Sequence, residues 1–129
     1  KGAWAQTYTG KQFWPLDPRE EEVNLIDIAH SLAQQPRFNG HSLHFYSVAQ
    51  HSVLVSHIVH PSQSLAALFH DASEAYTGDI ISPLKKFLPP EFKQIEKRIE
   101  NAIFKKFNIN PEAVDHKDIK QADKIILVT

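Results

Sequence analysis

The feature that most constrains the fold is a series of segments in which apolar residues recur at helical spacing. These segments cover residues 25–35, 47–60, 62–76, 90–107 and 115–129. Prolines at 36, 61 and 83 fall between them, where a helix must end because proline lacks the amide hydrogen of the next hydrogen bond. No stretch shows convincing alternation of apolar and polar residues. The sequence therefore predicts an all-α fold.

Length and chain ends set the expected domain organisation. With 129 residues, the chain has the size of one ordinary domain, so we predict a single domain over 1–129. Residues 1–22 contain aromatic residues, glycine and prolines without a clear period, and we expect an irregular lead-in there. The chain does not begin with methionine and still reads as helix at its last residue. We expect it to be truncated at its C-terminus.

Composition narrows the class of function. A net charge of -1 offers no broad basic surface for a nucleic acid duplex, so a small nucleotide is the better expected partner. The absence of cysteine excludes disulfides, thiolate metal sites and a cysteine nucleophile. No run approaches the ~18 apolar residues of a membrane span, and no signal peptide is recognisable at the N-terminus. We expect a cytoplasmic protein, for which a homodimer is possible.

Four ionisable residues fall on helix faces that should be buried. His51 lies on the second predicted helix, the pair His70-Asp71 on the third, and Asp123 on the last. An isolated buried carboxylate is costly to desolvate, so it needs a donor, a shifted pKa or a cation. A single metal ion at the helix junction would satisfy all four side chains.

The donor types indicate which ions fit. Imidazole nitrogens with carboxylate oxygens suit manganese, cobalt, zinc or iron, with magnesium as a further candidate, and the sequence does not identify the metal. Two histidines and two aspartates leave positions open for water, as a hydrolase requires. Glu74 lies at i+4 from His70, which places it on the same face of a continuous helix. It is the expected general base, or the group that orients the attacking water.

The spaced set His51, His70-Asp71 and Asp123 resembles the signature of the HD-domain phosphohydrolases. The run from His70 through Glu74 and Asp79, followed by Pro83 and Lys85, is similar to the matching segment of the bacterial 5'-deoxynucleotidases. This resemblance covers about residues 25–129. It implies a helical HD-domain bundle that hydrolyses a phosphate ester, most simply a (deoxy)nucleoside 5'-monophosphate.

The resemblance also implies roles for individual residues. The four residues of the signature would hold the metal, Glu74 would serve the attacking water, and Asp79 would contact the substrate and take part in catalysis. Arg37 and Phe38 stand where the family has an arginine and a tryptophan near the phosphate and the sugar, so Phe38 departs from the family pattern. Lys85, close to Asp79 in sequence, is a further candidate phosphate contact.

Other readings stay open at this stage. The same fold could act on a cyclic nucleotide as a phosphodiesterase or on a nucleoside triphosphate, although a triphosphate tail needs several converging cations. A non-catalytic module could also use the metal only to hold a nucleotide. Glu74 argues against this module, because binding alone gives no reason for a carboxylate beside the metal. The loop residues His41 and His44 have no assigned role.

Overall fold

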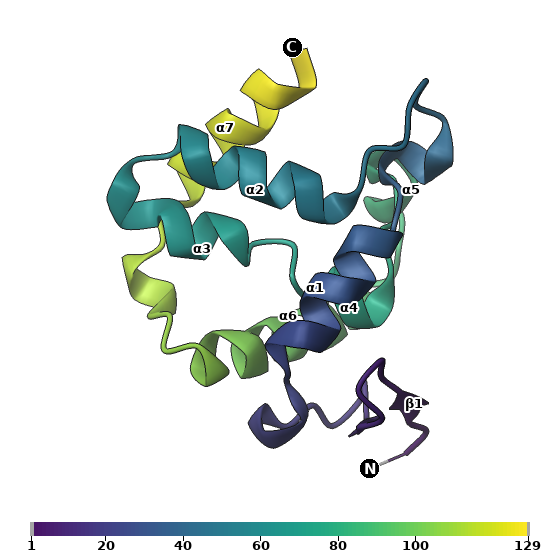
Figure 1. Ribbon diagram of the computed structural model, residues 1–129. Helices are drawn as coiled ribbons and strands as arrows, with labels where there is room; N and C mark the ends of the chain where they lie inside the picture. Colours follow the sequence, from purple (N-terminus) through teal and green to yellow (C-terminus); the bar gives the residue numbers. More distant parts are fainter. Residues whose placement is uncertain (1, 129) are drawn as a thin grey trace.

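The computed structural model describes residues 2–128, with side chains to residue 126, and it confirms the all-α prediction (Figure 1). The helices are α1 (Leu25–Gln34), α2 (Val48–Ile58), α3 (Ser64–Leu68), α4 (Glu74–Thr77), α5 (Ser82–Lys85), α6 (Pro90–Lys106) and α7 (His116–Val128). Short 3-10 helices lie at Glu20–Glu22, Arg37–Gly40, Pro61–Gln63 and Pro111–Ala113. Among the described residues, no helix has the length and apolarity to cross a membrane.

The longer helices begin at residues that satisfy their free amides. The Asn24 side chain accepts a hydrogen bond from the Asp27 amide at the start of α1. The Ser47 hydroxyl accepts one from the Gln50 amide at the start of α2. Pro90 opens α6, where its fixed φ suits the first helical turn. These local signals set where the supporting helices begin.

The core forms where α2 packs against α1, α3 and α7. In Figure 1, α2 and α7 run together at one end of the molecule, while α6 crosses the opposite end. Val55, Ala67 and Ile99 are fully buried in this core, with Ile119 from α7 nearly so. The packing brings the first turn of α2 and the middle of α7 close together.

The lead-in differs from the prediction of an irregular segment over residues 1–22. Strands β1 (Ala5–Gln6) and β2 (Gln12–Phe13) pair antiparallel around a turn in which Gly10 has a φ of 89°. The Phe13 ring is buried and stacks on Tyr76 at 3.9 Å between ring centroids. This aromatic contact holds the small sheet to the helices through a residue, Tyr76, that lies far from the sheet in sequence. Residue 1 lies outside the described residues.

The helix predicted over 62–76 is interrupted, and this is the main correction to the predicted elements. Residues 69–73 form turns between α3 and α4. In these turns, the amides of His70 and Ala72 bond to the carbonyls of Ala67 and Phe69, three residues back, and the Glu74 amide that follows bonds to the Asp71 carbonyl. Such bonds tighten the backbone and end the regular α-helix. Glu74 therefore begins α4 and does not share one continuous helix with His70.

Candidate metal centre

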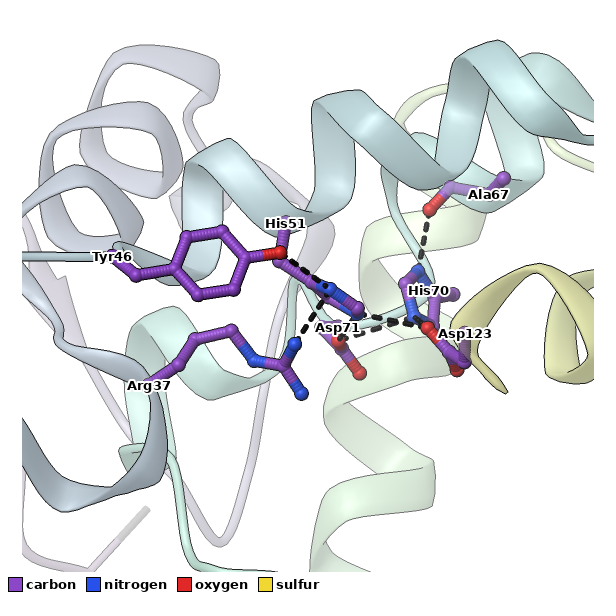
Figure 2. Close-up of polar contacts among 7 residues, drawn as sticks. All are labelled: Arg37, Tyr46, His51, Ala67, His70, Asp71 and Asp123. Atoms are coloured by element: carbon purple, nitrogen blue, oxygen red, sulfur yellow. Dashed lines mark hydrogen bonds and ion pairs between the residues drawn. The ribbon is translucent and has the colours of Figure 1, made fainter. Parts of the chain in front are cut away.

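The structure brings the four predicted ligand residues together (Figure 2). His51 Nε2 lies 2.8 Å from Asp123 Oδ1 and 3.9 Å from Asp71 Oδ2. His70 Nε2 lies 3.1 Å from Asp71 Oδ2 and 3.3 Å from Asp123 Oδ1. One ligand atom from each of His51, His70 and Asp71 falls within 4.8 Å of the others. Three separate segments thus supply one cluster of imidazole nitrogens and carboxylate oxygens.

Each segment positions its side chain differently. His51 is one turn into α2 and only 2% exposed, so its ring is fixed by the core. Asp123 projects from α7 toward it. His70 and Asp71 come from the turns between α3 and α4. Neighbouring side chains on a regular helix diverge by about 100°, and the irregular backbone at this point lets both reach the same site.

The hydrogen bonds of His70 test whether a cation fits. Its Nδ1 lies 2.5 Å from the Ala67 carbonyl oxygen, which can only accept, so Nδ1 carries the hydrogen. In the neutral ring, the lone pair of Nε2 then faces the oxygens of Asp71 and Asp123. This nitrogen is buried and has no well-directed hydrogen bond. A lone pair facing two carboxylates is the arrangement of a metal site whose histidine is oriented by a carbonyl, so the residues fit a divalent cation.

The electrostatics of the cluster lead to the same conclusion. Burial lowers the pKa of His70, but hydrogen bonds and charge from Asp123 and Asp71 outweigh it and raise the pKa to about 10. Burial raises the pKa of Asp123, yet its contacts with His51 and His70 hold it far below the usual range. Burial likewise acts against the ionised form of Asp71, whose pKa is lowered by His70. Without a metal ion, the two carboxylates therefore favour a proton on His70, and a divalent cation would take the place of that proton.

Glu74 lies beside the cluster and is 7% exposed. Burial, followed by the negative charges of Asp71 and Asp79, raises its pKa to about 10. The side chain of Gln35 donates to the Glu74 carbonyl oxygen at 2.8 Å and fixes the start of α4. A buried carboxyl group near two others indicates a site with excess negative charge, which a divalent cation would neutralise.

The predicted substrate residues meet at one cavity of about 450 Å³. Its wall contains Arg37, Phe38, His51, Asp71, Glu74, Asp79, Ile80, Ile81, Ser82, Pro83, Lys85, Lys120, Asp123 and Lys124. A larger groove of about 810 Å³ lies between the lead-in and α6, away from the cluster. His41 and His44 are exposed and do not line the cavity. The candidate site is thus a cleft with the ionisable cluster in its wall.

Three residues near the site were missed by the sequence reasoning. The Tyr46 hydroxyl lies 3.4 Å from His51 Nδ1 (Figure 2). Lys120 and Lys124 flank Asp123 on α7 and line the cavity. The two lysines lie one helical turn apart beside a predicted ligand, a spacing that could have indicated them. Tyr46 carried no comparable signal, because its place depends on how the loop before α2 folds back.

Lys85 also lines the cavity, but its ammonium group already has a partner. Its Nζ lies 3.1 Å from Glu96 Oε2. Burial acts against its charged form, and the pKa is nevertheless raised because Glu96 stabilises the ammonium ion. Any phosphate contact by Lys85 would therefore be shared with this ion pair.

Comparisons with known proteins show which proteins this chain resembles. The family described as YfbR-like 5'-deoxynucleotidase matches residues 29–117. The chain is 42% identical to the uncharacterized protein YfdR of Escherichia coli (strain K12), over 98% of this chain and 70% of that protein. It is 36% identical to a 5'-deoxynucleotidase of Pasteurella multocida, over 70% of this chain and 43% of that one.

A third relative carries a different activity in its name. The 4'-phosphooxetanocin A phosphatase of Priestia megaterium is 34% identical, over 63% of this chain and 52% of the phosphatase. The family match covers most of the chain and includes the segments that carry His51, His70 and Asp71. The chain therefore belongs to the YfbR-like 5'-deoxynucleotidase family of HD-domain phosphohydrolases.

Proposed function

We propose that this chain binds one divalent metal ion through His51, His70, Asp71 and Asp123 and hydrolyses a (deoxy)nucleoside 5'-monophosphate. The observation that carries the proposal is the meeting of these four side chains, with His70 Nε2 at 3.1 Å and 3.3 Å from two carboxylate oxygens. Family membership supports the phosphohydrolase activity. The expected homodimer and cytoplasmic location stay predictions.

Different residues of the chain are proposed to bind the substrate and to assist the attacking water. A bound divalent cation supplies Lewis-acid chemistry, which polarises the phosphoryl group and makes water a better nucleophile. Glu74, buried next to Asp71, orients the attacking water. A cation held by Asp71 would offset the negative charge that raises the Glu74 pKa, and the ionised carboxylate could then accept the proton of the water. Arg37, with its planar fork of donors, holds the phosphate oxygens. Asp79 and Phe38, on the same cavity wall, contact the rest of the nucleotide.

The charge of the cavity supports a substrate with few phosphates. Its wall carries four acidic side chains, while its cations are Arg37, Lys120, Lys124 and the already paired Lys85. A triphosphate tail needs several cations that converge on it. The relatives named as a 5'-deoxynucleotidase and as a phosphatase of 4'-phosphooxetanocin A both point to a single phosphate ester. We therefore propose monophosphates as the substrate class.

The test is a screen for phosphate release by protein loaded in turn with manganese, cobalt, zinc and magnesium. Substrates are the 5'-monophosphates of ribonucleosides and deoxyribonucleosides, a cyclic nucleotide and a triphosphate. Asp71→Ala protein, purified in parallel, controls for a contaminating phosphatase. Inorganic phosphate should be released from deoxyribonucleoside 5'-monophosphates and not by the variant. If metal-loaded protein binds these nucleotides but releases no phosphate, the chain is a binding module.

A further inference from the structure

The two ring nitrogens of His51 contact groups of opposite charge, one a hydrogen-bond donor and the other an acceptor. Arg37 Nη1 lies 2.7 Å from His51 Nδ1, and Asp123 Oδ1 lies 2.8 Å from His51 Nε2 (Figure 2). A guanidinium group has only donors, so the lone pair of Nδ1 must face Arg37. The hydrogen of a neutral ring is then on Nε2, where it is donated to Asp123. These contacts define one tautomer of His51.

This tautomer is incompatible with a metal at the cluster. His51 Nε2 is the nitrogen that faces Asp71 and Asp123, so a metal ligand there must offer its lone pair from Nε2. The ring hydrogen must then lie on Nδ1, where it would meet the donor of Arg37. Two donors cannot share one hydrogen bond. The contact between Arg37 and His51 and a metal on His51 Nε2 therefore exclude each other.

Tyr46 offers the partner that the other tautomer needs. Its hydroxyl lies 3.4 Å from His51 Nδ1 and can accept a hydrogen bond. Metal-bound histidines commonly donate their second ring hydrogen to an oxygen that fixes the ring. With Arg37 displaced, the Tyr46 hydroxyl is the oxygen in reach.

The main chain of Arg37 is anchored, while its side chain lies against two aromatic rings. The Arg37 amide donates to the Tyr46 carbonyl oxygen at 2.7 Å, so both residues are anchored to each other through their main chains. The guanidinium carbon lies 4.8 Å from the Phe38 ring centre and 5.5 Å from that of Tyr46. Cation–π contacts of this kind are weak near solvent, so they do not fix the guanidinium in one position. Arg37 also lines the cavity, so it can reach a ligand there.

We infer that Arg37 and Tyr46 are alternative partners of His51 Nδ1, and that binding of the metal transfers this nitrogen from Arg37 to Tyr46 and releases Arg37 into the cavity. The inference rests on the proposed function, because it requires His51 as a metal ligand. It makes Tyr46 a positioning residue for His51. It also gives an order of events, in which the guanidinium becomes available to the substrate phosphate once the metal is in place.

The direct test reads the tautomer of His51 by 15N NMR of the imidazole ring, with zinc as a diamagnetic probe. The His51 signals are assigned by their loss in His51→Gln. We expect hydrogen on Nε2 in protein stripped of metal and on Nδ1 after zinc is added. Hydrogen on Nδ1 in both states would overturn the inference while leaving the metal site intact. Zinc binding that leaves the His51 signals unchanged would instead refute the proposed ligand set, and the inference with it.

Two variants separate the partners. Tyr46→Phe should weaken zinc binding, measured by competition with a chelator, by about three- to tenfold, the factor for one net hydrogen bond. Arg37→Met should strengthen it, while in protein without metal the hydrogen should stay on Nε2, because Asp123 still accepts it there. The gain from Arg37→Met should be smaller in the Tyr46→Phe background, where Nδ1 has lost its oxygen partner, whereas simple loss of a repelling charge would strengthen zinc binding equally in both backgrounds.

The matched controls lie outside the site. Tyr8→Phe, whose ring stacks on His30, and Arg19→Met, whose guanidinium pairs with Asp17, should leave both zinc affinity and the His51 signals unchanged. If Tyr46→Phe binds zinc as tightly as the parent protein, or if Arg37→Met strengthens zinc binding equally with and without the Tyr46 hydroxyl, the inference is wrong.

Discussion

Helix α6 and the turns at residues 69–73 differ in regularity and in what their residues do. α6 runs for 17 residues with a proline at its start, Ile99 and Ile103 buried, and lysines in its last turn. The helix predicted from its sequence over 90–107 agrees with the observed bounds of α6. The turns interrupt a helix that the apolar pattern predicted, and they carry His70 and Asp71. Regular helices supply the core and the single ligands His51 and Asp123, while irregular backbone occurs where the neighbouring side chains of His70 and Asp71 must converge.

The largest effect that this contrast predicts is at Asp71. Asp71→Ala removes a proposed ligand, so it should abolish stoichiometric metal binding. Phosphate release should fall by more than about 100-fold, because the loss of a residue that only hydrogen-bonds a metal ligand already costs up to about that factor. Metal content by mass spectrometry and phosphate assays measure both. The far-ultraviolet circular dichroism should stay helical. Full metal occupancy in this variant would remove Asp71 from the site.

Glu74 should affect the rate of the reaction and not the binding of the metal. Glu74→Gln keeps the shape of the side chain but removes its basicity, so kcat should fall by about 10²–10⁴-fold. Metal content and the substrate Kd should stay near those of the parent protein, because Glu74 is proposed to act on water. Unchanged kcat would place the general base elsewhere, with Asp79 as the next candidate.

The opposite result is expected in α6. Ile103 is 1% exposed, and Ile103→Ala should lower the free energy of unfolding by about 2–5 kcal/mol through lost burial and a cavity. Below the unfolding transition, metal content and kcat should not change, because Ile103 does not line the cavity. Denaturant titration and kinetics measure the two quantities. A large loss of kcat without a loss of stability would mean that α6 also shapes the site.

The smallest effects concern the phosphate contacts. Arg37→Lys replaces a planar fork with a point charge, and KM for a monophosphate should rise roughly tenfold, as for one charged hydrogen bond. Lys85→Met should raise KM less, because Lys85 already pairs with Glu96. Steady-state kinetics of both variants test this order. A larger rise in KM for Lys85→Met than for Arg37→Lys would make Lys85 the main phosphate contact.

Much of this architecture could be predicted because it depends on local chemistry. The caps at Asn24 and Ser47, the proline at the start of α6 and the apolar stripes all act within a few residues. The meeting of His51, His70, Asp71 and Asp123 was predictable because each stood on an apolar face, where an unpaired ionisable group is costly.

Other features depend on contacts that no local pattern reveals. Asp27 is buried in α1 because its carboxylate accepts from the Thr9 amide and hydroxyl, at 2.7 Å and 3.0 Å. The sheet in the lead-in requires Phe13 to find Tyr76. The turns before Glu74 contain backbone hydrogen bonds that span three residues, and His70 Nδ1 bonds to the Ala67 carbonyl oxygen. These bonds compete with those of a regular α-helix.

One cation is proposed to bridge α2, the turns at residues 69–73, and α7. Anomalous diffraction at the zinc edge, from crystals of zinc-loaded protein, tests it most directly. We predict a single strong peak about 2.0–2.2 Å from His51 Nε2, His70 Nε2 and oxygens of Asp71 and Asp123. Zinc bound at other residues, or at this cluster without His51, would contradict the account.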